Sequence, residues 1–387
     1  MKILITADKF RGSLEANQVI QAVKNGLVSV DSHLEIQTSI LADGGEGSME
    51  LLSKAYDCQR HQIQVKNANH DWIESNLGFN PKTKIAVLEM ASYVGLAQLS
   101  ENQQDPKSTS SFGLGQAIKE AVTLGAQKII IGIGGSATND GGAGMLAALD
   151  FQFLAKDEKS ISPNGGNLNL ISKILPPVKN VCENIELILA SDVQNPITGK
   201  SGATMTYASQ KGASEEELDI LEKNMIQYAH LIERTTSKKS FEIDGYGAAG
   251  GVPLSACSFL NAKLVSGSQL IFDSLDLGEK IKEADVVITG EGKIDNQTMF
   301  GKAITPVIEM SQVLNKKLVL VCGLFDAKSN PTLSKIPRFE LTSLAEKLNK
   351  NSYKDAFELC ELVGGRIIHS LRSKQAFLLI SILGNLL

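Results

Sequence analysis

KIIIGIGGSATNDGGAGML, residues 128–146, is the stretch of sequence that best indicates the fold. It begins as a β-branched run, passes through an eleven-residue loop with five glycines (134–144), and ends in apolar residues of helical type. A strand that leads through such a loop into a helix is typical of a parallel α/β sheet. An ordinary turn between a strand and a helix needs only about four residues. The length of this loop therefore indicates that it binds a ligand.

The same pattern recurs along the chain. Five other short apolar or β-branched runs end in loops rich in glycine and acid, which begin at Asp8, Asp43, Ser191, Gly290 and Gly323. In a parallel sheet, ligands bind beyond the carboxyl ends of the strands. If these strands share one sheet, their loops converge on one edge, and the sequence predicts the functional site there.

The length of 387 residues predicts two domains. The alternation of strand and helix patterns assigns residues 1–56, 104–150 and 280–387 to one domain with a parallel sheet covered on both faces. Residues 57–103 and 151–279 have a different character, part β-rich and part loop-rich. We assign them to a second domain inserted in the first.

Composition disfavours several classes of function. A net charge of −5 and an aromatic share of 5% give no basis for a nucleic-acid partner. The apolar run 376–387 is too short to span a bilayer, so no membrane partner is expected. The five cysteines contain no C-x-x-C pair, which indicates reduced thiols in the cytoplasm. The oligomeric state stays open, with a homodimer as one candidate.

The glycine-rich loop admits two interpretations. Residues 132–137 fit the dinucleotide fingerprint G-x-G-x-x-A, which keeps an NAD-dependent oxidoreductase of a small hydroxy acid as an alternative. The glycines continue past that motif, however, where a helix should already have begun. An anion-binding loop at 134–144 accounts for them better, because glycine lets backbone N–H groups approach phosphate oxygens closely. Ser136, Thr138 and Asn139 would add side-chain donors.

Charged residues gather in the same loops. The acids are Asp43, Glu46, Asp140, Asp192, Glu291 and Asp295. Magnesium bound to phosphates needs one or two carboxylates, and a hydroxyl that attacks phosphorus needs a carboxylate to accept its proton. An anionic substrate also requires cations, which are Lys9, Arg11, Lys211, Lys293 and Lys302. Together these residues favour a metal–phosphate site over a non-catalytic anion sensor, which would gain little from a general base.

Several long motifs resemble those of the bacterial-type glycerate kinases, in the order of that family. They are LADGGEGS (41–48), GIGGSATNDGGAGML (132–146), SDVQNP (191–196), QKGA (210–213), GAAGG (247–251) and VITGEGKIDNQTMFGK (287–302). The resemblance implies transfer of the γ-phosphoryl group of ATP, with Mg²⁺, to a hydroxyl of D-glycerate. It also implies an α/β fold of two domains: one Rossmann-like, with a mostly parallel sheet and discontinuous in sequence, and one smaller and mixed. The active site would lie in the cleft between them.

For such a reaction we expect Asp192 to be the general base, with Asp43 as its rival. Phosphates would be held by Gly134, Gly135, Ser136, Asn139 and Lys302, and Lys293 would neutralise the transferring charge. Magnesium would be reached by Asp43, Glu291 and Asp295. The substrate would be bound by Arg11, Lys9, Asp8 and Ser13. The sequence leaves open whether the 2- or the 3-hydroxyl is phosphorylated.

Overall fold

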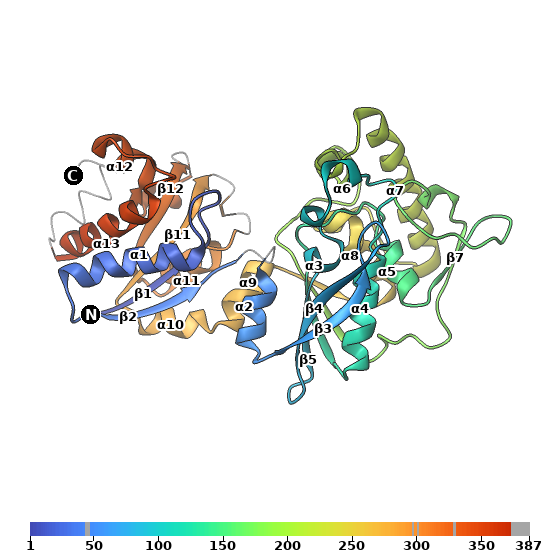
Figure 1. The fold of residues 1–387 in the computed structure, drawn as a ribbon, viewed down its shortest axis with the longest axis horizontal. Coiled ribbons are helices and arrows are strands. Elements are labelled where there is room, and N and C mark those ends of the chain that lie inside the picture. The colour runs from blue at the N-terminus through green and yellow to red at the C-terminus, as the bar shows by residue number, and fades with distance from the viewer. Residues whose placement is uncertain (43–46, 296–297, 300–301, 328–329, 373–387) are drawn as a thin grey trace. The chain divides into compact units, whose positions relative to one another are not determined.

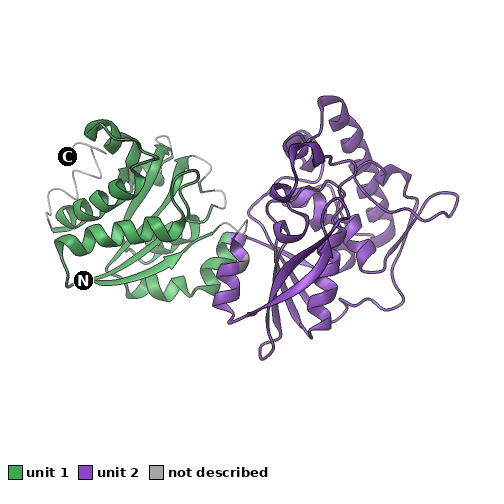
Figure 2. Cartoon of the chain, viewed as in Figure 1, with its two compact units in different colours: residues 1–43, 268–387 green, residues 44–267 purple. Residues whose placement is uncertain are grey.

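The computed structural model describes residues 1–42, 47–295, 298–299, 302–327 and 330–372. The chain divides into two compact units (Figure 2). Unit 1 comprises residues 1–43 and 268–387, and unit 2 comprises residues 44–267. Unit 1 is therefore built from both ends of the chain, whereas unit 2 is one continuous segment.

Unit 1 contains a five-stranded sheet of order β13-β12-β11-β1-β2, in which every neighbouring pair is parallel (Figure 1). Its strands are β1 (Lys2–Ala7), β2 (Glu35–Ile40), β11 (Val286–Asp295), β12 (Lys317–Asp326) and β13 (Arg338–Glu340). From β1 the chain moves to β2 on one side, and it returns to β11 on the other side. The topological switch point thus lies between β1 and β11, where open α/β sheets bind their ligands.

Helices pack on both faces of this sheet because successive side chains of a strand point to opposite faces. Ile3 and Ile5 of β1 join a buried cluster with α1, α12 and α13, and Leu4 joins another with α10 and α11. A Cβ atom at Gly26 would lie 1.8 Å from the carbonyl oxygen of Glu361, so α1 and α13 pack in close contact. The helices are α1 (Ala16–Val30), α9 (Gly267–Ser274), α10 (Leu277–Glu283), α11 (Thr305–Val313), α12 (Leu341–Leu348) and α13 (Ala356–Arg372).

Unit 2 contains a six-stranded mixed sheet of order β10-β9-β6-β5-β4-β3. The first four strands of this order are mutually parallel, and β4 and β3 are antiparallel additions. The strands are β3 (Gln59–Lys66), β4 (Trp72–Asn80), β5 (Ile85–Glu89), β6 (Lys128–Gly132), β9 (Glu186–Ala190) and β10 (Lys263–Val265), and β7 (Gln152–Leu154) pairs separately with β8 (Lys173–Leu175). The two main sheets, one parallel and one mixed, confirm the predicted α/β class.

The position of β6 differs from the sequence prediction. Residues 104–150 were expected to lie with 1–56 and 280–387, but β6 lies between β5 and β9 in unit 2. The glycine-rich loops therefore follow strands of two sheets, not of one. Unit 2, which holds the mixed sheet, is also the longer unit and not the smaller one. A sequence pattern identifies a strand but not its partners, because pairing depends on contacts between distant residues.

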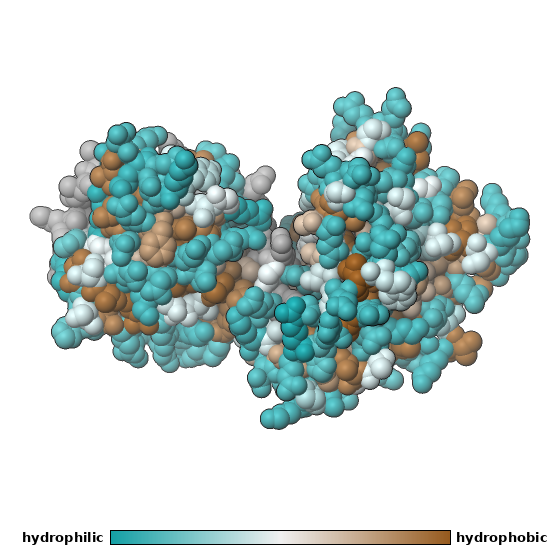
Figure 3. Space-filling model, in the orientation of Figure 1, coloured by the Kyte–Doolittle hydropathy of each residue, from teal (hydrophilic) through white to brown (hydrophobic). Residues whose placement is uncertain are grey.

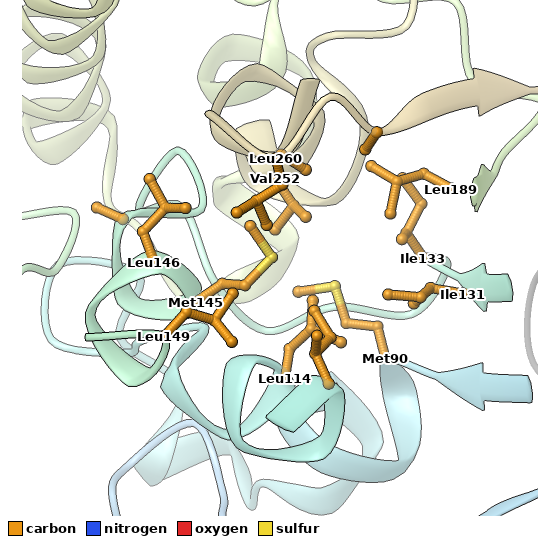
Figure 4. Close-up of a cluster of buried hydrophobic side chains, with 14 of the residues drawn as sticks. Met90, Leu114, Ile131, Ile133, Met145, Leu146, Leu149, Leu189, Val252 and Leu260 are labelled. Atoms are coloured by element: carbon orange, nitrogen blue, oxygen red, sulfur yellow. The ribbon is translucent and has the colours of Figure 1, made fainter. Parts of the chain in front are cut away.

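The core of unit 2 holds the glycine-rich loop in place. Ile131 of β6, Leu114, Met145 and Val252 are fully buried and meet in one apolar cluster (Figure 4). The surrounding helices are α2 (Ser48–Ala55), α3 (Ala91–Val94), α4 (Phe112–Thr123), α5 (Ala143–Ala148), α6 (Ala203–Tyr207), α7 (Glu215–Thr236) and α8 (Val252–Phe259). Strand β6 and helix α5 are both fixed by this cluster, so the loop between them is anchored at both ends.

Hydrophilic residues cover most of the face shown in Figure 3, and hydrophobic residues form small patches on it. Trp72 and Val313 are among the exposed apolar side chains. Among the helices that the structure describes, none combines the length and the apolar character needed to cross a bilayer.

Candidate functional site

A cavity of about 580 Å³ lies in unit 1 at the carboxyl ends of β1, β11 and β12. Eight of the predicted site residues line it: Asp8, Lys9, Arg11, Ser13, Glu291, Lys293, Asp295 and Lys302. Phe10, Leu324, Leu341 and Tyr353 contribute apolar surface. The switch point of the sheet thus brings together residues from opposite ends of the sequence.

Lys302 is the centre of a charged network in this cavity. Its Nζ lies 3.0 Å from Oδ1 of Asp295 and 3.4 Å from Oε1 of Glu291, and it donates to the backbone carbonyl of Lys293 at 3.1 Å. The Thr298 hydroxyl also donates to Oε1 of Glu291 at 2.8 Å. Groups predicted for metal and phosphate binding are therefore in direct contact.

Glu291 has an unusual environment for a carboxylate. It is 6% exposed, and burial raises its pKa to about 7. The Lys302 ammonium and the Thr298 hydroxyl act in the opposite direction, whereas the nearby charge of Asp8 adds to the increase. Such a carboxyl is poised to exchange a proton or to gain a cation near neutral pH.

The same donors fit magnesium. Within the described residues, no group of three or more His, Cys, Asp and Glu side chains could hold a metal ion by itself. Magnesium rarely uses such a cage, since it keeps several waters and binds one or two carboxylates together with substrate phosphates. Glu291 and Asp295 supply two carboxylates on the wall of one cavity. Asp43, the third predicted ligand, lies outside the described residues, as does Glu46.

The loop after β1 presents its cations because one residue anchors it. Phe10 is 3% exposed, and its backbone exchanges hydrogen bonds with Leu14. Lys9 and Arg11, on either side of Phe10, line the cavity. The Ser13 hydroxyl donates to the backbone carbonyl of Tyr353 at 3.1 Å, which ties this loop to the C-terminal part of unit 1.

In unit 2, only the first part of the glycine-rich loop reaches the surface. Gly134 is partly exposed and Gly135 is exposed, with a left-handed φ of 72°. Ser136 is 6% exposed, and Asn139 is 1% exposed. The Asn139 amide donates to the Thr204 hydroxyl at 3.1 Å. Asn139, predicted to hold phosphate, is therefore placed in the interior, away from any ligand at the surface.

The buried part of the loop packs against the second glycine-rich motif. The Gly141 N–H donates to the Gly250 carbonyl at 2.9 Å, and a Cβ at Gly250 would lie 1.9 Å from the carbonyl oxygen of Thr138. Helix α5 begins only at Ala143, so the loop does not have the dinucleotide arrangement, in which the helix starts within the motif. These glycines serve close backbone packing.

Asp140 joins two helix starts. It is fully buried, and its carboxylate accepts the N–H groups of Ser111, Gly142 and Gly144 at 2.7–3.2 Å and the Ser111 hydroxyl at 2.8 Å. Ser111 and Gly142 directly precede α4 and α5. A carboxylate at a helix start satisfies N–H groups that lack partners within the helix. Asp140 is therefore a scaffold residue.

Lys211, which the sequence offered only as one of several candidate cations with no assigned role, lies behind the exposed part of the loop. It is 3% exposed, and its Nζ donates to Oγ of Ser136 at 2.9 Å and to the carbonyl of Thr138 at 2.8 Å. Burial lowers its pKa to about 8, and the charge of Asp140 opposes that decrease. The motif QKGA (210–213) was the available signal, but a lysine in sequence gives no indication of burial.

Asp192 follows β9, the neighbour of β6 in the sheet, so its loop emerges beside the loop of Gly134 and Ser136. Its Oδ1 accepts the Ser266 hydroxyl at 2.6 Å, and Ser266 follows the adjacent strand β10. The carboxyl edge of unit 2 therefore combines a carboxylate with glycine-rich backbone.

Comparisons with known proteins identify the family of the chain. The sequence model of the glycerate kinase family matches residues 3–368. A glycerate kinase from Halalkalibacterium halodurans is 35% identical over 322 residues, which cover 83% of this chain and 85% of that protein. A glycerate 2-kinase from Escherichia coli K12 is 36% identical over 327 residues, which cover 84% of this chain and 85% of that protein. The crystal structure of a glycerate kinase 2 from Salmonella typhimurium LT2 has a TM-score of 0.80 at 31% identity, covering 97% of this chain and 99% of that chain. The chain therefore belongs to the glycerate kinase family of enzymes.

Proposed function

We propose that the chain phosphorylates D-glycerate with ATP, and that the γ-phosphoryl group is transferred to the 2-hydroxyl to give 2-phosphoglycerate. Membership of the glycerate kinase family supports glycerate as the substrate. The relative from Escherichia coli, a glycerate 2-kinase, supports the choice of hydroxyl. The observation that carries the proposal in this chain is the unit 1 cavity, which gathers cations and carboxylates at a ligand-binding edge.

Each charged group of the cavity has a part in this proposal. Arg11 and Lys9 bind the carboxylate of glycerate, with Asp8 and Ser13 completing that region. Lys302 and Lys293 offset phosphate charge, which matters because phosphoryl transfer depends mainly on positioning and electrostatic stabilisation. Glu291 and Asp295 would hold magnesium, which would supply positive charge to offset the phosphates. Lys302 then exchanges part of its contact with the two acids for phosphate oxygens.

At the carboxyl edge of the unit 2 sheet, four residues have parts in this proposal. Asp192 accepts the proton of the attacking hydroxyl, and the hydrogen bond from Ser266 holds its carboxylate in one orientation. Gly134 and Gly135 offer backbone N–H groups at the surface, and Ser136 offers its hydroxyl. These groups bind phosphate oxygens of the nucleotide.

The proposal is tested by measuring ADP release with Mg·ATP and D-glycerate, L-glycerate or other small hydroxy acids. Proton-coupled phosphorus NMR identifies the product, since a phosphate on C2 couples to one proton and a phosphate on C3 couples to two. We expect a doublet from D-glycerate. Absence of ADP release above the substrate-free rate would refute the proposed activity, and a triplet would refute the proposed hydroxyl.

A further inference from the structure

The Ser136 hydroxyl is held from behind by a buried ammonium group. Lys211 donates to Ser136 Oγ at 2.9 Å and to the Thr138 carbonyl at 2.8 Å. Ser136 is 6% exposed and follows the exposed Gly135, whereas Lys211 is 3% exposed. The serine therefore lies between the surface of the loop and the lysine.

This contact fixes the direction in which Ser136 can donate. A lysine ammonium has three N–H donors and no acceptor, so Oγ must be the acceptor in the contact with Lys211. The hydrogen of the Ser136 hydroxyl is thus available for another partner. Among the described residues no acceptor of that hydrogen is present. A phosphate oxygen at the exposed start of the loop would meet this requirement, and the positive charge behind Oγ strengthens such a donor.

The chain places Lys211 at this point with a constrained turn. Gly212 has a φ of 103°, and a Cβ there would lie 2.1 Å from the carbonyl oxygen of Gln104. The turn after Lys211 therefore requires glycine. A neutral amide could satisfy the same two acceptors without the desolvation that lowers the Lys211 pKa to about 8. A lysine ammonium that stays buried in spite of this desolvation cost is typical of functional sites.

We propose that Lys211 is a positioning residue that directs the Ser136 hydroxyl towards a phosphate oxygen of the nucleotide. This inference rests on the proposed ATP-dependent function and deepens it. Lys211 does not touch the nucleotide, and all of its effect on phosphate passes through Ser136.

The test is a double-mutant cycle with Ser136→Ala and Lys211→Met. Initial rates with ATP varied, and calorimetric binding of Mg·ATP without glycerate, provide two readouts. Each single variant should raise the KM for ATP and the Kd for Mg·ATP about tenfold or more, the size expected for a hydrogen bond to a charged group. The double variant should be no more than about threefold worse than either single variant, since both changes remove one pathway. Lys211→Gln, which keeps neutral donors, should restore part of the loss.

Lys238→Met is the matched control. Its Nζ also donates to carbonyls, of Cys257 and Ser258, but at the end of α8. This variant should melt at a lower temperature with the KM for ATP unchanged.

Two results would overturn the inference: losses that multiply fully in the double variant, or normal Mg·ATP binding by Ser136→Ala. If Lys211→Met does not fold, a cycle of Ser136→Ala with Lys211→Gln replaces it: the loss that remains in Lys211→Gln should vanish in the Ser136→Ala background, and a loss that persists there would overturn the inference. If the wild type releases no ADP with D-glycerate, the proposed function is refuted but the inference about Lys211 is not. Binding of Mg·ATP still tests the hydrogen bond from Ser136 to phosphate.

Discussion

Replacing Lys211 with methionine should change how the stability of unit 2 depends on pH. The pKa of Lys211 falls from 10.5 to about 8 on folding because the ammonium is fully buried. Between these values the unfolded chain binds more protons than the folded chain, so the contribution of Lys211 to stability rises with pH. Methionine does not bind a proton, so it makes no pH-dependent contribution to stability. The other lysines of the chain are common to both proteins, and their contributions cancel in the comparison.

The expected size follows from the two pKa values. At pH 7 the buried charge disfavours folding by about 3 kcal/mol, and at pH 10 by about 1 kcal/mol, at about 1.4 kcal/mol per pKa unit. The wild type should therefore gain about 2 kcal/mol relative to Lys211→Met between pH 7 and pH 10. The hydrogen bonds to Ser136 and Thr138 change the offset between the two proteins, but they do not change this slope.

The measurement is urea unfolding of both proteins at pH 7, 8, 9 and 10. The chain has one tryptophan, Trp72 in β4, so its fluorescence reports on unit 2 without a signal from unit 1. A difference in unfolding free energy that stays constant across this range would refute a low pKa for Lys211. A difference that moves in favour of the variant would contradict its burial as a charged group.

Three further predictions concern other parts of the molecule. Gly250→Ala should lower the free energy of unfolding in urea by several kcal/mol, and Gly125→Ala by only about 1–2 kcal/mol. Both glycines have a positive φ, but only a Cβ at position 250 would meet the Thr138 carbonyl. Equal losses in the two variants would contradict this packing argument. In metal-free protein, the unfolding free energy of the wild type should fall by up to about 3 kcal/mol relative to Glu291→Gln as pH rises from about 4.5 to 7, because the pKa of Glu291 is raised to about 7 in the folded protein. Calorimetric melting of both proteins across this range measures the effect, and an equal pH dependence of the two would refute the raised pKa. Asp192→Asn should lower kcat for ADP release at least about 100-fold with normal melting, and near-normal turnover would exclude it as the base.

The strands and their loops could be predicted from sequence, but the way they combine could not. The runs 2–7, 128–133 and 317–322 have the β-branched composition of buried strands, and the structure contains strands there. Periodicity reports which side of an element is buried, and it carries no information about the neighbouring strand. For that reason the sequence groups β6 with the wrong sheet, although it gives the ends of this strand to within one residue. The gathering of Asp8 and Glu291 in one cavity was predicted from the loops that end their strands, and the structure supplies the reason, since β1 and β11 are neighbours in the sheet.

The glycine-rich loop shows why a sequence motif alone does not identify which of its residues bind a ligand. Glycine permits a close approach to phosphate, and it equally permits a close approach to another backbone. Gly135 is exposed, whereas Gly141 is packed against Gly250 within the interior. The two uses have the same sequence signature. They can be separated only when the partner of each segment is known, and here the partner comes from residues 247–251.

The acidic residues of the loops also have two different uses, to hold the scaffold or to face a ligand site. By sequence alone Asp140 is equivalent to Asp192 and Glu291, since all three lie in loops that follow predicted strands. In the structure, the fully buried Asp140 carboxylate accepts the N–H groups of Ser111, Gly142 and Gly144 and the Ser111 hydroxyl at the starts of two helices, so it is committed to the scaffold. Glu291 instead faces a cavity and contacts Lys302, an ammonium that phosphate can attract away. A carboxylate is a credible ligand when its present partners can be exchanged, and an acid held by backbone N–H groups fails that criterion wherever its motif occurs.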